Sequence, residues 1–125
     1  MKIIFADNTE LEVRSIMGGL SRIQNADRDM LSIEVDPSIA NTEELRNLFI
    51  DKDKTTRIRT SVIEDDQELV SEVGEDYTIY ISATNERREV RGEPGIIGPP
   101  EWEEVNIVKI AQLTYMEKLL EKLQQ

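Results

Sequence analysis

The sequence contains no cysteine and no histidine, and these two absences remove the side chains on which several common chemistries depend. Without cysteine there can be no disulfide framework, zinc–thiolate site or thiol nucleophile. Without histidine the chain lacks the commonest general base near neutral pH and the commonest transition-metal ligand. We therefore expect a protein that is not an enzyme and that carries neither a metal ion nor a cofactor.

Long apolar runs and an excess of positive charge are lacking as well. No stretch approaches the roughly 20 apolar residues of a membrane-spanning helix, and the apolar run within residues 1–7 is too short for a signal peptide. The chain carries 26 acidic and 15 basic residues, a net charge of −11, which repels phosphate backbones and anionic membrane surfaces. We expect no nucleic-acid or membrane partner, and a protein that is cytoplasmic when synthesised.

The length and the hydrophobic pattern indicate the fold class. A chain of 125 residues with 38% hydrophobic content fits one domain with one modest core. Apolar and polar residues alternate with a period of two in at least four segments, which predicts strands with one buried face. The sequence therefore predicts an α+β fold over residues 1–112: a mainly antiparallel β domain, sandwich or barrel-like, with about seven or eight short strands.

Turn residues separate the predicted strands. A polar turn at residues 6–9 and a second turn near residues 25–28 predict two hairpins, and residues 64–67 predict a third turn. Gly18 and Gly19 predict a break or a sharp bend. Asp36-Pro37 ends a strand because proline cannot donate to a ladder. The charged residues 51–54 are interpreted as a turn, and the clearest strand is expected at residues 77–83.

Two helices are expected. Asn41 with Glu44 three residues later matches a capping box, and apolar residues with helical spacing follow, so a short helix is predicted at about 41–50. Residues 113–125 are predicted to form an amphipathic C-terminal helix. Its apolar face either packs on the protein's own sheet or pairs with another chain. The candidate protein-interaction residues on this segment are Leu113, Met116, Leu119, Leu120 and Leu123.

The segment between the last two predicted strands, at about 91–100, is rich in glycine and proline and is predicted to be a loop. One interpretation is a plain surface loop. The other is a partner-binding loop that uses Ile96 and Ile97 together with Trp102, because aliphatic and aromatic anchors favour interfaces. Trp102 is also compatible with covering the edge of a core.

Three features of the sequence have some likeness to catalytic or ligand-binding motifs but lack the residues those motifs require. The acidic clusters at residues 64–66 and 51–53 lack the spacing of a calcium loop and are interpreted as solvated turns. The sequence distinguishes no carboxylate pair of the kind that glycoside hydrolysis needs. The glycines of residues 92–98 are followed by Pro99-Pro100 rather than by the lysine and hydroxyl of a phosphate-binding loop.

Five segments, in this order, resemble a family of small proteins encoded among the tail and lysis genes of phages and prophages of Gram-positive bacteria. The segments are residues 1–7 (MKIIFAD), 9–13 (TELEV), 24–31 (QNADRDML), 42–49 (TEELRNLF) and 108–118 (VKIAQLTYMEK). The resemblance carries no catalytic residues. It implies a structural or adaptor role in a phage tail or baseplate, with other tail proteins as partners and a place in the virion once assembled. Self-association through the C-terminal helix is compatible with the resemblance, because phage tails are symmetric assemblies. The alternative is a small acidic binding or regulatory protein that engages a basic protein partner.

Overall fold

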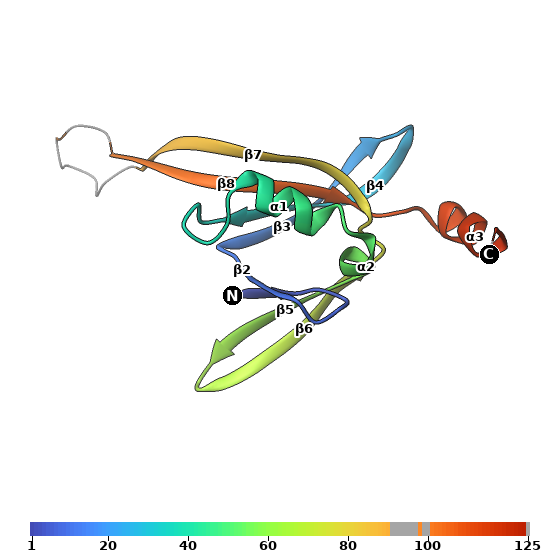
Figure 1. Ribbon diagram of the computed structural model, residues 1–125, viewed down its shortest axis with the longest axis horizontal. Helices are drawn as coiled ribbons and strands as arrows, with labels where there is room; N and C mark the ends of the chain where they lie inside the picture. The colour runs from blue at the N-terminus through green and yellow to red at the C-terminus, as the bar shows by residue number, and fades with distance from the viewer. Residues whose placement is uncertain (91–97, 99–100, 125) are drawn as a thin grey trace.

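The computed structural model describes residues 1–90, 98 and 101–124, and in these residues the chain forms eight strands and three helices (Figure 1). All strand pairings are antiparallel and give two four-stranded sheets. The first sheet has the order β2-β1-β5-β6 and is built from β1 (Lys2–Ile4), β2 (Glu10–Glu12), β5 (Arg57–Glu64) and β6 (Gln67–Glu75). The second has the order β3-β4-β8-β7 and is built from β3 (Ser15–Ile23), β4 (Ala26–Val35), β7 (Ile79–Val90) and β8 (Glu101–Ala111). The predicted α+β, mainly antiparallel class is confirmed.

Two of the hairpins close through two-residue turns. Gln24 and Asn25 join β3 to β4 with φ values of 51° and 63°, and Asp65 and Asp66 join β5 to β6 with φ values of 50° and 62°. Positive φ at both central residues matches the right-handed twist of the flanking strands. Both turns lie within two residues of where the sequence predicted them.

Gly18 and Gly19 do not break the strand, and the prediction of a break there is wrong. Both glycines lie inside β3, and their pairing with Leu31 and Met30 of β4 is uninterrupted. A Cβ atom added at either position would meet nothing within 4 Å. Because β3 is an edge strand, glycine there costs some packing but leaves the ladder intact.

The two sheets and helix α1 (Thr42–Phe49) bury one shared core. In Figure 1, α1 lies against the long β7–β8 pair, and it contacts both strands. The rings of Phe5 and Phe49 meet edge to face with centroids 5.2 Å apart. The fully buried side chains include Ile3, Phe5, Ile33, Val35, Leu45, Phe49, Ile58, Val108 and Ile110.

The predicted capping box starts α1 as expected. The Asn41 side chain accepts a hydrogen bond from the Glu44 N–H at 2.8 Å, and the Glu44 carboxylate accepts one from the Asn41 N–H at 3.4 Å. The charged segment that follows is a one-turn helix, α2 (Lys52–Thr55), rather than a turn. Asp51 caps it by accepting from the Asp53 N–H at 3.0 Å.

Strands β7 and β8 are longer than predicted. Their pairing runs on to Val90 opposite Glu101, well past Ala83, where the predicted strand ended. The outer half of this pair is mostly charged, so it carries no apolar alternation. Backbone pairing and cross-strand ion pairs hold it, such as Arg88 Nε to Glu103 Oε1 at 3.0 Å.

Candidate protein-interaction surface

Helix α3 (Tyr115–Leu123) begins two residues after Leu113, and a capping box fixes its first turn. The Thr114 hydroxyl accepts from the Glu117 N–H at 3.3 Å, and the Glu117 carboxylate accepts from the Thr114 N–H at 2.9 Å. The position of the cap explains the late start. Leu113 lies before the helix, is partly buried, and donates its N–H to the Asp76 carbonyl at 3.0 Å.

Charged contacts attach this first turn to the body of the protein. Arg28 of β4 donates two hydrogen bonds to the Glu117 carboxylate, one of them at 3.0 Å. The Arg28 side chain is only 2% exposed, and it also donates to the carbonyls of Ile23 at 2.8 Å and Gln112 at 3.2 Å. The guanidinium is therefore satisfied by partners from three segments of the chain, and α3 is held at its N-terminal end.

The same contacts keep the Glu117 carboxylate ionised. Hydrogen bonding from Arg28, with help from the Thr114 N–H, lowers the pKa of Glu117 to about 2. Glu117 therefore stays ionised across the neutral range, and the pair keeps its charge-assisted hydrogen bonds there. Lys118 adds a second contact, its Nζ lying 3.4 Å from the Asp76 carboxylate.

Beyond its first turn the helix is uncovered. None of its residues is buried, and in Figure 1 it stands out from the body at one end of the molecule. Four candidate residues, Met116, Leu119, Leu120 and Leu123, share one side of the helix, which we call the α3 apolar face. Their exposed fractions are 61%, 39%, 53% and 74%. Of the two interpretations left open by the sequence, packing on the protein's own sheet is not the arrangement found among the described residues.

Helical geometry places opposite charges on the two sides of the α3 apolar face. At 100° per residue, Glu117 lies beside one edge of this face and Lys122 beside the other, whereas Lys118 and Glu121 lie on the opposite side of the helix. Glu117 and Lys118 are engaged by the body of the protein. Glu121 and Lys122 lie one turn further out on an exposed part of the helix.

An open groove of ≈ 420 Å³ lies at the base of α3 and extends the exposed apolar surface toward β3. Leu20 of β3, which is 80% exposed, lines it together with Leu113 and Tyr115. Its remaining lining is polar, and it includes Arg28, whose donors already have partners. The groove can therefore accept apolar side chains at its rim but offers no free guanidinium to an anionic ligand.

The other candidates lie elsewhere. Ile96 and Ile97 fall outside the described residues. Trp102 is at the start of β8, whereas α3 follows the end of that strand, so the tryptophan is not part of the α3 surface. Its ring is 51% exposed, and the Arg87 guanidinium lies 5.2 Å from the ring centroid, a cation–π contact across β7 and β8.

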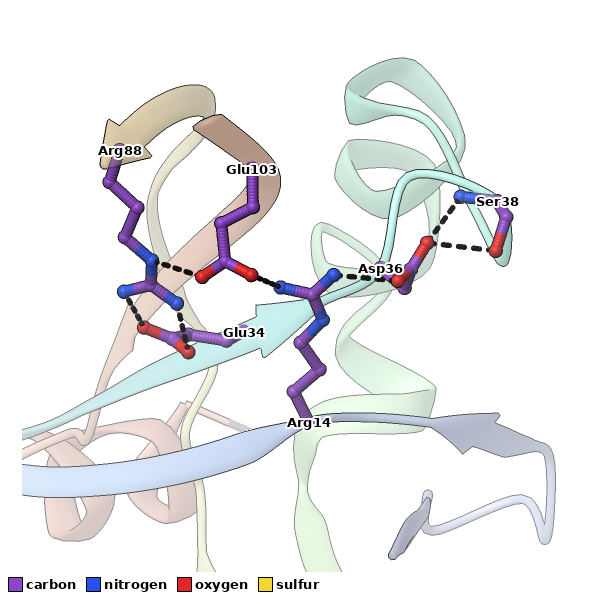
Figure 2. A network of polar contacts seen from close by, with 6 residues as sticks. All are labelled: Arg14, Glu34, Asp36, Ser38, Arg88 and Glu103. Carbon is purple, nitrogen blue, oxygen red and sulfur yellow. Dashed lines mark hydrogen bonds and ion pairs between the residues drawn. The ribbon is translucent and has the colours of Figure 1, made fainter. Parts of the chain in front are cut away.

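A polar network across the second sheet was not predicted (Figure 2). Arg88 donates to Glu34 at 2.9 and 3.0 Å and to Glu103 at 3.0 Å. Glu103 also accepts from Arg14 at 3.4 Å, and Arg14 donates to Asp36 at 2.7 Å. The residues come from distant parts of the sequence, and only the strand register brings them together, so no local signal could have shown the network.

The network connects neighbouring strands and is not suited to acid–base catalysis. Hydrogen bonding from Arg14 lowers the pKa of Asp36 to about 2, and Arg88 lowers the pKa of Glu34. Arginine pairing therefore keeps these carboxylates ionised, whereas a general acid needs a raised pKa. The arginines in turn tie β4, β7 and β8 to the segment that enters β3.

Among residues 1–90, 98 and 101–124, no cluster of three or more acidic side chains is arranged to hold a metal ion. No helix in that part of the chain has the length and apolar character needed to cross a membrane. Comparisons of the chain with protein-family models, with curated proteins and with solved structures find no match. The resemblance to phage tail proteins therefore stays a prediction.

Proposed function

We propose that the protein is a non-enzymatic structural or adaptor component of a phage or prophage tail or baseplate, and that it works by docking through the α3 apolar face. The observation that carries this proposal is the contrast within α3. The first turn is fixed by Arg28 and Asp76, while Met116, Leu120 and Leu123 are more than half exposed. A helix held at one end with its apolar side uncovered is suited to meeting a partner helix.

The energetics favour covering this face. Full burial of a leucine-sized side chain is worth about 1.5–3 kcal/mol, and the α3 apolar face offers four such side chains. A nine-residue helix is only marginally stable by itself in water. The ion pairs of Glu117 and Lys118 with the body of the protein, together with the capping box, therefore help to keep α3 formed. Because the helix is already formed and attached, binding costs less ordering entropy than it would for a disordered tail.

The occupant that we propose is the α3 helix of a second copy. One edge of the α3 apolar face carries Glu117 and the other edge carries Lys122, so two copies of the helix placed face to face do not repel each other by charge. Glu121 lies on the far side of the helix and takes no part in this contact.

The size of the contact predicts weak association by α3 alone. Nine residues make a helix about 13 Å long. Two such helices bury far less than the roughly 1,200 Å² of a stable interface. In a symmetric assembly each copy makes this contact alongside others, and the combined effect exceeds the single affinity. Weak pairing in isolation is compatible with a tail component that assembles on other tail proteins.

The test is sedimentation velocity over a wide concentration range, run beside thermal unfolding. Leu120→Glu should keep the protein monomeric at concentrations at which the parent associates, without lowering its unfolding temperature. Met17→Glu is the matched control, because Met17 is 61% exposed on β3 and does not line the groove at the base of α3. A parent that is monomeric throughout contradicts the proposal. So does a Leu120→Glu variant that unfolds at a much lower temperature, since α3 would then belong to the core.

The alternative function, an acidic protein that binds a basic partner, has one observation in its favour. The turn that joins β5 to β6 is exposed and carries Glu64, Asp65 and Asp66 in succession. If the main activity is binding of a basic partner at this turn, variants of these three residues will abolish function and variants of α3 will not.

A further inference from the structure

The hairpin of β5 and β6 extends beyond the core. Ile58 and Ser61 near its base are buried, but every residue from 62 to 72 is exposed. In Figure 1 the hairpin points away from the second sheet. We call residues 62–70 the hairpin arm. This segment contributes nothing to the core, so its sequence is free to serve another purpose.

The hairpin arm is apolar on both of its faces. Val62 pairs with Leu69, which places these two side chains on one face. Ile63 and Val70 lie on the opposite face, because Ile63 pairs with Glu68 and Val70 with Ser61. The exposed fractions are 42% for Val62, 47% for Leu69, 74% for Ile63 and 53% for Val70. An antiparallel sheet usually presents apolar residues on one face only, so this arrangement suits a segment that is covered by a partner.

The backbone of the hairpin arm offers a second means of binding. β6 is the last strand of its sheet, so its outer N–H and C=O groups have no strand partner within the described part of the chain. Natural edge strands are commonly protected by charged side chains, proline or a β-bulge. β6 has neither lysine nor proline, and its bulge lies at Val73, outside the hairpin arm. Its charged residues are glutamates, which do not repel a basic strand. An added strand could therefore hydrogen-bond along this edge.

Charge decides which partner fits. The hairpin arm carries Glu64, Asp65, Asp66 and Glu68 and no basic residue. No ion pair joins any of the four to another side chain that the structure describes. Two hairpin arms brought together would repel each other, and the net charge of −11 adds to that repulsion. A strand that carries lysine or arginine would be attracted instead.

We propose that the hairpin arm is a docking site for a β-strand of a basic partner protein, which adds to the free edge of β6. On one face of β6, Glu68 and Val70 select a basic residue followed two positions later by an aliphatic residue. On the other face, Leu69 selects a second aliphatic residue. Main-chain hydrogen bonds supply affinity, and these side chains supply specificity. The proposal does not depend on α3.

The test uses a synthetic strand peptide with Lys-Val-Val-Val-Lys at its centre, which reads the same in both strand directions and places lysine and valine opposite Glu68 and Val70 on one face and valine opposite Leu69 on the other. The control peptide has glutamate in place of lysine. Isothermal titration should show binding of the lysine peptide only. Hydrogen exchange should show new protection in β6 on binding, because strand addition occupies the outer amides. Absence of binding, or protection elsewhere without any in β6, overturns the proposal.

Two variants of the hairpin arm separate its apolar and acidic contributions. Ile63→Thr combined with Val70→Thr removes apolar side chains while keeping strand-forming residues. The triple variant Glu64→Gln, Asp65→Asn, Asp66→Asn removes three charges, and asparagine tolerates the positive φ of the turn. Each should weaken peptide binding by about tenfold, which corresponds to about 1.4 kcal/mol. Since these side chains are exposed, the unfolding temperature should not change.

The matched control is the triple variant Glu86→Gln, Glu89→Gln, Glu104→Gln, which removes the same charge from exposed positions on β7 and β8. It should bind the lysine peptide within about twofold of the parent. If it loses as much affinity as the arm triple variant, the binding is unspecific attraction to an acidic protein and the proposal fails. Leu120→Glu should bind the peptide like the parent, which separates this site from α3.

Discussion

The guanidinium of Arg28 and the carboxylate of Glu117 join a buried position on a central strand to an exposed helix. Arg28 lies on β4, which pairs on both sides, and Glu117 is the third residue of α3. Two hydrogen bonds connect them, and Arg28 is 2% exposed while Glu117 is 36% exposed. The placement of α3 is therefore set by an ion pair rather than by apolar packing.

Glu117→Gln should loosen α3 without unfolding it. Glutamine still serves in a capping box, so the helix start is retained while the charged partner of Arg28 is lost. Weakening a charge-assisted hydrogen bond to a buried guanidinium should cost about 1–2 kcal/mol. Hydrogen exchange should become about tenfold faster in α3 and remain unchanged in β8. Equal acceleration in both elements would show that α3 and the core open together.

The same pair predicts a pH dependence confined to α3. The pKa of Glu117 is lowered from 4.5 to about 2 in the folded protein, so its contribution to attachment is complete above pH 4.5 and is lost as the pH falls toward 2. Amide exchange in α3, corrected for its intrinsic pH dependence, should rise through that window. Glu117→Gln should show no such rise. A parallel rise in the variant would show that the effect does not come from Glu117.

The sequence predicted the elements whose signals are local. The capping box at Asn41 and Glu44 gave the start of α1, because it depends on residues three apart. Alternating apolar residues gave the inner strands, because a half-buried strand must alternate. The same reasoning misjudged Gly18 and Gly19, since glycine has a weak preference and the pairing of β3 with β4 overrides it.

The candidate surfaces depend on relationships that a single sequence does not show. The apolar spacing of α3 was visible, but its uncovered position follows from Arg28, which is distant in the sequence from Glu117. The exposure of the hairpin arm could not be predicted for a different reason. Ile58, Thr60 and Val62 alternate with Arg59 and Ser61 without interruption, and nothing local shows that the core ends between Ile58 and Val62. Burial is a property of the whole fold, whereas alternation is a property of one strand.

Phe49→Ala should cost about 3–5 kcal/mol in free energy of unfolding. Phe49 is fully buried and packs edge to face on Phe5, so its removal leaves a cavity between α1 and the first sheet. Ile50→Ala is the control, because Ile50 is 47% exposed and should change the free energy by about 0.5 kcal/mol or less. Urea unfolding measures both. A small effect at Phe49 would show that α1 is not part of the cooperative core.

Asn106→Leu should destabilise the protein although leucine is apolar and the site is buried. Asn106 is 2% exposed, donates to the Ala40 carbonyl at 2.8 Å and accepts from the Asn85 side chain at 2.8 Å. Leucine would leave the carbonyl without its donor, at a cost of about 1–3 kcal/mol. Asn85→Ala, at an exposed position, should cost less. If Asn106→Leu is neutral, the amide contributes nothing beyond filling space.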